Sequence, residues 1–141
     1  MSAQIQWPDD AARLYTALGR LVRRLRQDGV TDLGPSSFST LVSVVQHGPL
    51  RLGDLAKRES VSPPTLSRII VHLVGSGYLE RHPDPQDGRA VLVAATEAGS
   101  RLVADVLAAR TAALRDQLAR LTDTDRDLLV AALPALESLT S

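Results

Sequence analysis

The chain has 141 residues, enough for one domain with or without helical extensions. Its hydrophobic fraction of 44% excludes a disordered chain, and because aromatic residues make up only 3%, the core must be aliphatic. It has no cysteine, which excludes disulfides and thiolate metal sites, and its 16 basic and 16 acidic residues cancel, a balance that by itself argues against nucleic-acid binding.

The apolar runs and the first residues of the chain indicate its cellular location. No apolar run reaches the ~18 residues that a membrane span requires. Residues 1–15 lack the basic start and the apolar centre of a signal peptide. We therefore expect a soluble cytoplasmic protein with no membrane partner.

The first predicted element is an amphipathic helix over residues 8–27. Pro8 suits the first helical turn, and Gly29 suits its end, where a left-handed residue closes many helices. Aliphatic residues recur at helical spacing along one face, namely Leu14, Leu18, Leu21, Val22 and Leu25. We expect this stripe to pack on the C-terminal helices and on a second copy of the chain.

Two shorter helices are predicted next, over residues 35–46 and 52–58. Pro35 suits a first helical position. Leu33 and Phe38 have the spacing of a hydrophobic staple across the start of the first of these helices, and the segment HGP ends it.

The fourth predicted helix has the clearest start in the chain. Ser62 is a good N-cap, and Pro63 follows at the first helical position. One side of the helix is apolar and faces the core, with Leu66, Ile69, Ile70 and Leu73. The opposite side is left open and consists of Pro64, Arg68, Val71 and Gly75, with Thr65 and His72 beside them.

A hairpin and two helices complete the chain. Residues 78–82 and 90–95 are predicted strands, joined by the turn-rich sequence PDPQDGR. A long helix is expected over residues 96–121, and Thr122 opens a last helix. Pro134 should kink that helix, because it removes a backbone hydrogen bond.

The charges are distributed unevenly, and their distribution is more informative than their sum. Between Ser60 and Leu79 there is one arginine, one histidine and no acidic residue. From Glu97 onward, seven acidic residues face five arginines. A helix with an open, acid-free face, followed by a polar turn ending in Asp-Gly-Arg, is the layout of a DNA recognition helix and a wing.

Several segments, in chain order, resemble the MarR-type winged helix-turn-helix regulators. They are LGPSSFSTL, GPLRLGDLAKR, VSPPTLSRIIVHLVGSGYLER, the wing HPDPQDGRAVLV and the helix start ATEAG. The wing is the most specific of these, because its Asp-x-Arg follows one strand and precedes another. The chain departs from the family pattern at Gly34, where a threonine cap is common, and in the wing, where Arg89 stands alone and two or more arginines are usual.

The resemblance implies a mainly α fold with a small β-hairpin wing (α+β). A winged helix-turn-helix unit over residues 35–96 would follow an N-terminal dimerisation helix in 1–34 and precede C-terminal dimerisation helices in 97–141. The resemblance also implies a cytoplasmic homodimer that binds double-stranded DNA at a pseudo-palindromic operator. As in many family members, the protein would be a repressor released by a small aromatic effector.

The candidate DNA contacts lie on the fourth helix, the hairpin and the wing. Arg68 is expected to meet a guanine edge or a phosphate, and Arg89 to enter the minor groove. From the family motif, Asp87 is expected to hold the Arg89 guanidinium in place. The full predicted set is Ser62, Pro64, Thr65, Ser67, Arg68, His72, Arg81, Asp87 and Arg89. Ordinary explanations stand beside these roles, since Ser62 can simply cap its helix and Arg68 can be a solvated surface residue.

Other functions have less support in the sequence. His47, His72 and His82 are far apart, so we expect no metal site. There is no nucleophile motif and no phosphate-binding glycine loop, so we expect no enzyme, no catalytic residue and no cofactor. The main alternative is a winged-helix module that binds protein without specific DNA binding, which the neutral net charge and the apolar Pro64 and Val71 favour.

Overall fold

The computed structural model describes residues 9–140, so the predicted role of Pro8 lies outside the described residues. The chain divides into two compact units. Residues 30–107 form one unit, and the described residues 9–29 together with 108–140 form the other. Helix α5 (Glu97–Ala119) contributes to both. Within the described range, no helix is long and apolar enough to cross a membrane.

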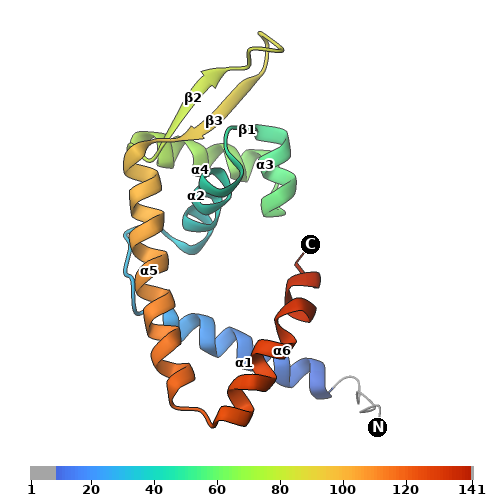
Figure 1. Cartoon of the computed structure of the whole chain (residues 1–141). Helices are drawn as coiled ribbons and strands as arrows, with labels where there is room; N and C mark the ends of the chain where they lie inside the picture. The colour runs from blue at the N-terminus through green and yellow to red at the C-terminus, as the bar shows by residue number, and fades with distance from the viewer. Residues whose placement is uncertain (1–8, 141) are drawn as a thin grey trace. The chain divides into compact units, whose positions relative to one another are not determined.

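The unit of residues 30–107 combines three complete helices and the first part of α5 with a three-stranded antiparallel sheet (Figure 1). These elements are α2 (Pro35–His47), β1 (Leu50–Arg51), α3 (Leu52–Glu59), α4 (Pro63–Gly75), β2 (Leu79–Pro83) and β3 (Val91–Ala95). The strands lie in the order β1-β3-β2, and the hairpin of β2 and β3 extends beyond the helices. This is a winged helix, and the predicted mainly α fold with a β-hairpin wing is confirmed.

The helix starts follow from local sequence. α2 begins at Pro35 after an extended Gly34, and α4 begins at Pro63 after an extended Ser62, as predicted. Leu33 and Phe38 are both buried around the start of α2, in agreement with a hydrophobic staple.

The hydrophobic core lies entirely within this unit as far as the structure describes the chain. The side chains with at most 2% exposure are aliphatic except for one threonine: Leu41, Leu55, Leu66, Ile70, Leu73, Leu79, Val44, Val93 and Thr40. Burying an aliphatic side chain of this size stabilises a fold by roughly 1.5–3 kcal/mol. Leu66, Ile70 and Leu73 fix one side of α4 in this core, and the opposite side of the helix does not take part in it.

Strand β1 is not among the predicted elements. It has two residues, too few for an alternating pattern to appear in the sequence. It forms because Leu50 and Arg51 pair with Val93 and Leu92 of β3. The pairing places Arg51 on an edge strand, opposite Leu92 and next to the base of the wing.

The start of α5 is attached by close contacts to the link between α4 and β2. The Thr96 hydroxyl donates to the Gly77 carbonyl at 2.6 Å and accepts from the Gly99 N–H at 3.1 Å. The Thr96 N–H donates to the Tyr78 carbonyl at 3.1 Å. Gly77, two residues after the end of α4, has a φ of 81°, a left-handed conformation that favours glycine.

The other unit consists of α1 (Asp9–Leu25), the second half of α5 and α6 (Asp123–Ser138). Neither α1 nor α6 contains a buried residue. Leu14 of α1 is 46% exposed, so the apolar stripe predicted for the first helix remains uncovered in the single chain, and Leu128 of α6 is likewise 64% exposed. α6 continues as one helix through Pro134, and Thr122 caps it by accepting from the Asp125 N–H at 3.1 Å.

Candidate nucleic-acid interface

The first turn of α4 is closed by a compact cap. The Ser62 hydroxyl accepts a hydrogen bond from the Thr65 N–H at 3.4 Å and donates to Thr65 Oγ1 at 2.9 Å. Pro63 has no N–H that would need a partner. The capping role of Ser62 is therefore confirmed, and Pro64 stays exposed beside it.

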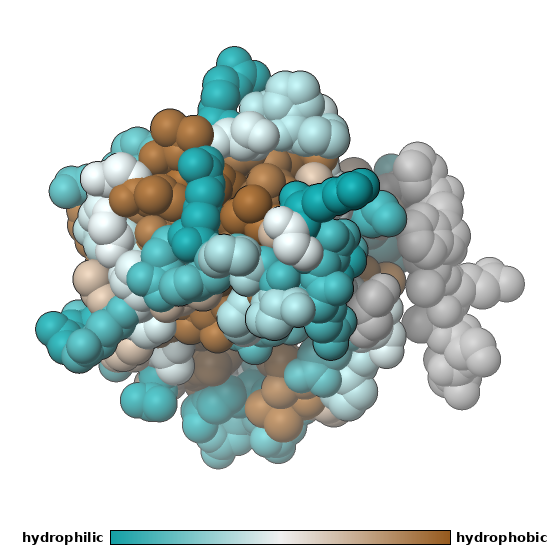
Figure 2. Space-filling model, turned by 90° about the horizontal axis from the view of Figure 1, so that it is seen from above, coloured by the Kyte–Doolittle hydropathy of each residue, from teal (hydrophilic) through white to brown (hydrophobic). Residues whose placement is uncertain are grey.

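The outer side of α4 is open, as predicted. Its exposed residues are Pro64, Ser67, Arg68, Val71, His72 and Gly75, while Thr65 is half-buried. Val71 is 60% exposed, so it does not pack against a neighbouring element of the described chain. Arg68 forms no ion pair with any residue that the structure describes. Seen from above, the molecule carries hydrophilic side chains that project past hydrophobic patches (Figure 2).

Strand β2 contributes two exposed basic residues in sequence. Arg81 makes no ion pair within residues 9–140. His82 Nε2 lies 2.8 Å from Glu80 Oε1, so a carboxylate accompanies the histidine. A carboxylate repels phosphate, which makes Arg81 the stronger contact of the two for a nucleic-acid backbone.

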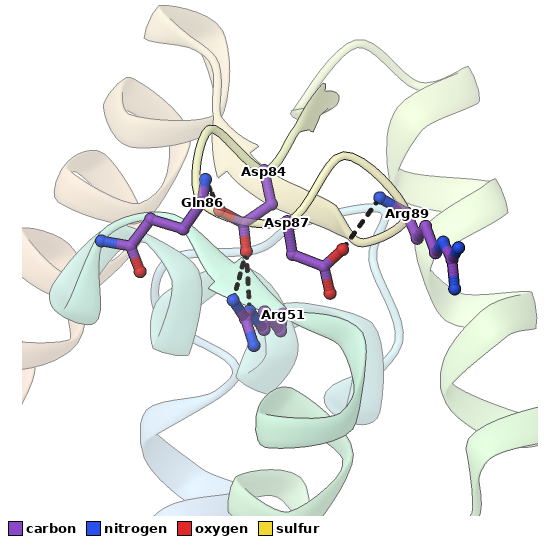
Figure 3. Close-up of polar contacts among 5 residues, drawn as sticks. All are labelled: Arg51, Asp84, Gln86, Asp87 and Arg89. Atoms are coloured by element: carbon purple, nitrogen blue, oxygen red, sulfur yellow. Dashed lines mark hydrogen bonds and ion pairs between the residues drawn. The ribbon is translucent and has the colours of Figure 1, made fainter.

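The wing differs from the sequence prediction in the role of Asp87. Asp87 Oδ1 accepts a hydrogen bond from the Arg89 backbone N–H at 3.1 Å, and it does not hold the Arg89 guanidinium. Figure 3 shows the Arg89 side chain directed away from the Asp87 carboxylate. The prediction was wrong because a short aspartate side chain bonds easily to the backbone two residues ahead. The exposed Arg89 guanidinium is left without an acidic partner in the described chain.

A different aspartate anchors the wing. Asp84 Oδ2 accepts from Arg51 Nε at 2.8 Å and from Arg51 Nη2 at 2.5 Å, and Asp84 Oδ1 accepts from the Gln86 N–H at 2.9 Å (Figure 3). The hydrogen bond from the Gln86 N–H is the largest cause of a lowered pKa at Asp84, and the Arg51 guanidinium adds to it. Together they outweigh desolvation, which acts to raise the pKa.

Sequence reasoning missed both Arg51 and Asp84. The sequence Asp-Pro-Gln favours the local turn at Asp84, and that signal was available. No local signal links Asp84 to Arg51, because the two residues are 33 positions apart.

All nine predicted contacts belong to the same compact unit. They come from α4 and its N-cap, from β2 and from the wing loop between β2 and β3. The arrangement offers guanidinium groups without acidic partners, small hydroxyls and exposed apolar groups. These are the groups that meet phosphates, base edges and thymine methyls in DNA grooves.

Comparisons with known proteins agree with this geometry. A model of the MarR family matches residues 33–91. An uncharacterized HTH-type transcriptional regulator of Mycobacterium bovis is 37% identical over 130 residues, which cover 92% of this chain and 91% of that protein. The HTH-type transcriptional repressor MdtR of Bacillus subtilis is 26% identical over 105 residues, which cover 74% of this chain and 66% of that protein.

A solved structure is similar over almost the whole length. The crystal structure of RV1404 from Mycobacterium tuberculosis matches with a TM-score of 0.82 and 28% identity. The match covers 98% of this chain and 97% of that one. The similarity therefore extends beyond the winged unit to the terminal helices.

Proposed function

Because the chain belongs to the MarR family of DNA-binding transcriptional regulators, we propose that it is a homodimeric repressor of a pseudo-palindromic operator. One observation carries the proposal. The open side of α4 is exposed, has Arg68 and contains no acidic residue. A surface with this charge pattern suits the negative major groove. A repressor of genomic DNA works in the compartment that holds that DNA, so a cytoplasmic location is part of the proposal.

In this proposal α4 lies in the major groove. Arg68 donates to a guanine edge or a phosphate, and Pro64 meets a thymine methyl. The hydroxyls of Ser62, Thr65 and Ser67 and the ring of His72 lie near the backbone at the groove edge. These five residues and Pro64 are all on the exposed or half-exposed part of α4 or its cap.

The hairpin and the wing extend the same contact surface along the DNA. Arg81 approaches a phosphate, and Arg89 enters the adjacent minor groove. Asp87 acts on the backbone of Arg89 rather than on DNA. The Asp87 carboxylate is compatible with DNA binding in this proposal, because it accepts a hydrogen bond from the backbone of its own loop instead of facing a phosphate.

The uncovered helices support the homodimer. α1 and α6 bury no residue, although both have aliphatic side chains at helical spacing. Tyr15 is 83% exposed and Val130 is 61% exposed, which is unusual for a chain that works alone. A second copy would cover these surfaces and place two winged units at successive major grooves.

Repression and its release complete the proposal. Repression has support in the name of the related Bacillus subtilis repressor. A small aromatic effector would lower DNA affinity by binding more tightly to a dimer with wrongly spaced recognition helices. By linkage, DNA must then lower effector affinity by the same factor. Equal effector affinities with and without operator would exclude this route.

The first experiment is a binding measurement on the DNA upstream of the protein's own gene. Fluorescence anisotropy at two salt concentrations, with an unrelated duplex as the control, separates specific from nonspecific binding. Tight, selective and salt-sensitive binding would support the proposal. No binding to either duplex, even at low salt, would contradict it.

A winged-helix module that binds protein through the same surface is the second candidate. The exposure of Pro64 and of Val71, which is 60% exposed, favours it. It predicts little dependence of binding on salt and no preference for a palindrome, so the same measurement distinguishes the two functions.

A further inference from the structure

The base of the wing is bridged between the two outer strands of the sheet. Arg51 of β1 is paired with Leu92 of β3, and His82 of β2 is paired with the same Leu92 from the other side. Asp84 follows two residues after His82. The ion pair between Arg51 and Asp84 therefore connects β1 with the end of β2, although β3 lies between them (Figure 3).

The Asp84 carboxylate is buried and has a partner at each oxygen. Its side chain is only 5% exposed, whereas that of Arg51 is 47% exposed. Oδ2 is bound by the Arg51 guanidinium and Oδ1 by the Gln86 N–H. A buried carboxylate that loses its cationic partner is costly, so the base of the wing cannot move away from Arg51 freely.

The contacts continue from Asp84 to Arg89. The Asp84 N–H donates to the Ala90 carbonyl at 3.0 Å, and the Ala90 N–H donates to the Asp87 carbonyl at 3.0 Å. The Asp87 carboxylate in turn holds the Arg89 N–H. The backbone of Arg89 is thus fixed through a closed loop that is anchored at Arg51, while its guanidinium remains available.

From this arrangement we infer that Arg51 and Asp84 are positioning residues that hold the wing loop so that Arg89 is presented to DNA in a defined place. The inference rests on the proposed DNA-binding function. Neither residue touches DNA in it. The physical reason is entropic: a loop that is ordered before binding loses less conformational freedom when its arginine enters a groove.

Operator affinity in a double-mutant cycle tests the inference. Arg51→Gln should weaken binding about tenfold in the wild-type background, comparable to the loss of one oriented contact. In the Arg89→Ala background the same substitution should cost less than about twofold, because no guanidinium is left to position. Arg51→Lys, which keeps a cation near Asp84, should restore part of the affinity.

Two further measurements separate positioning from misfolding. Hydrogen exchange at the Arg89 and Ala90 amides should accelerate in Arg51→Gln, while the amides of α4 stay protected. Asp84→Asn removes the same ion pair from its other side. The asparagine keeps an oxygen that accepts the Gln86 N–H, but it has no charge to attract Arg51. Arg101→Gln is the matched control, because Arg101 forms an exposed pair with Glu97 and should not affect the wing.

The outcomes are distinct. Suppose that the wild type binds its operator and that the losses of affinity in Arg51→Gln and Arg89→Ala multiply in the double variant. Arg51 then contacts DNA itself or acts independently of Arg89, so the positioning inference is overturned while the proposed function stands. If the wild type binds no DNA, both the proposed function and the inference are overturned. Unchanged amide exchange in Arg51→Gln would also overturn the inference.

Discussion

Gly99 lies so close to Tyr78 that a Cβ atom on Gly99 would be 2.2 Å from the Tyr78 carbonyl oxygen. The same carbonyl accepts the Thr96 N–H, so it cannot turn aside without losing that bond. The first turn of α5 therefore packs directly on the chain that links α4 to the hairpin. Only glycine allows this approach.

Gly99→Ala should destabilise the protein. The added methyl group meets backbone rather than a flexible side chain, and such overpacking costs roughly 1–3 kcal/mol. Urea unfolding would measure the loss. Gly53→Ala is the control, because nothing lies within 4 Å of a Cβ there and alanine suits a helix, so it should be neutral or stabilising. Equal stability of both variants would contradict the close packing.

Arg89→Ala should weaken binding to specific and unrelated DNA alike. Its guanidinium is free in the described chain and adds one cation to the interface. The slope of log affinity against log salt should fall by about one. Anisotropy titrations over a salt series provide the slope, and Arg101→Ala should leave it unchanged. A slope that does not change in Arg89→Ala would remove this residue from the interface.

Arg68→Ala should have a different effect, because Arg68 lies on the recognition helix. If it reads a guanine, its loss costs about 1–3 kcal/mol and relaxes the preference at one base pair of each half-site. Binding to a set of operators with single base changes would test this. A uniform loss over all sequences would identify a phosphate contact instead.

Leu128→Glu should dissociate the proposed dimer. Leu128 is 64% exposed in the single chain, so a charge there does little to one copy but would be buried between two copies. Sedimentation equilibrium would follow the change in mass. Thr124→Asp adds a charge to an exposed position of the same helix and should leave the dimer intact. A monomeric wild type would argue against the dimer from the outset.

The stability of the wing anchor should depend on acid. The pKa of Asp84 is lowered in the folded state, chiefly by the Gln86 N–H and then by Arg51. The stability that these bonds provide is therefore fully present above the unfolded pKa of about 3.9 and is lost as the pH falls through the lower folded value. The difference in unfolding free energy between wild type and Asp84→Asn should shrink below about pH 4. A constant difference would show that Asp84 does not titrate with folding.

In the wing, some features follow from neighbouring residues in the sequence and others depend on tertiary contacts. Its two strands and its turn were predicted, because alternating and turn-forming residues act over a few positions. The role of Asp87 was predicted wrongly, since two hydrogen-bond partners compete for one carboxylate and only the geometry of the turn selects the backbone N–H. β1 escaped prediction because two residues carry no period.

Local sequence was enough to specify the helices, the hairpin and the open side of α4, though not β1. Caps such as Ser62 with Pro63, and the spacing of Leu66, Ile70 and Leu73, act within one or two helical turns and do not depend on the rest of the chain. The tertiary structure alone decided that Arg51 meets Asp84 and that Gly99 meets Tyr78. Such pairs are far apart in the chain, and they form only because the packed core and the strand order bring them within bonding distance.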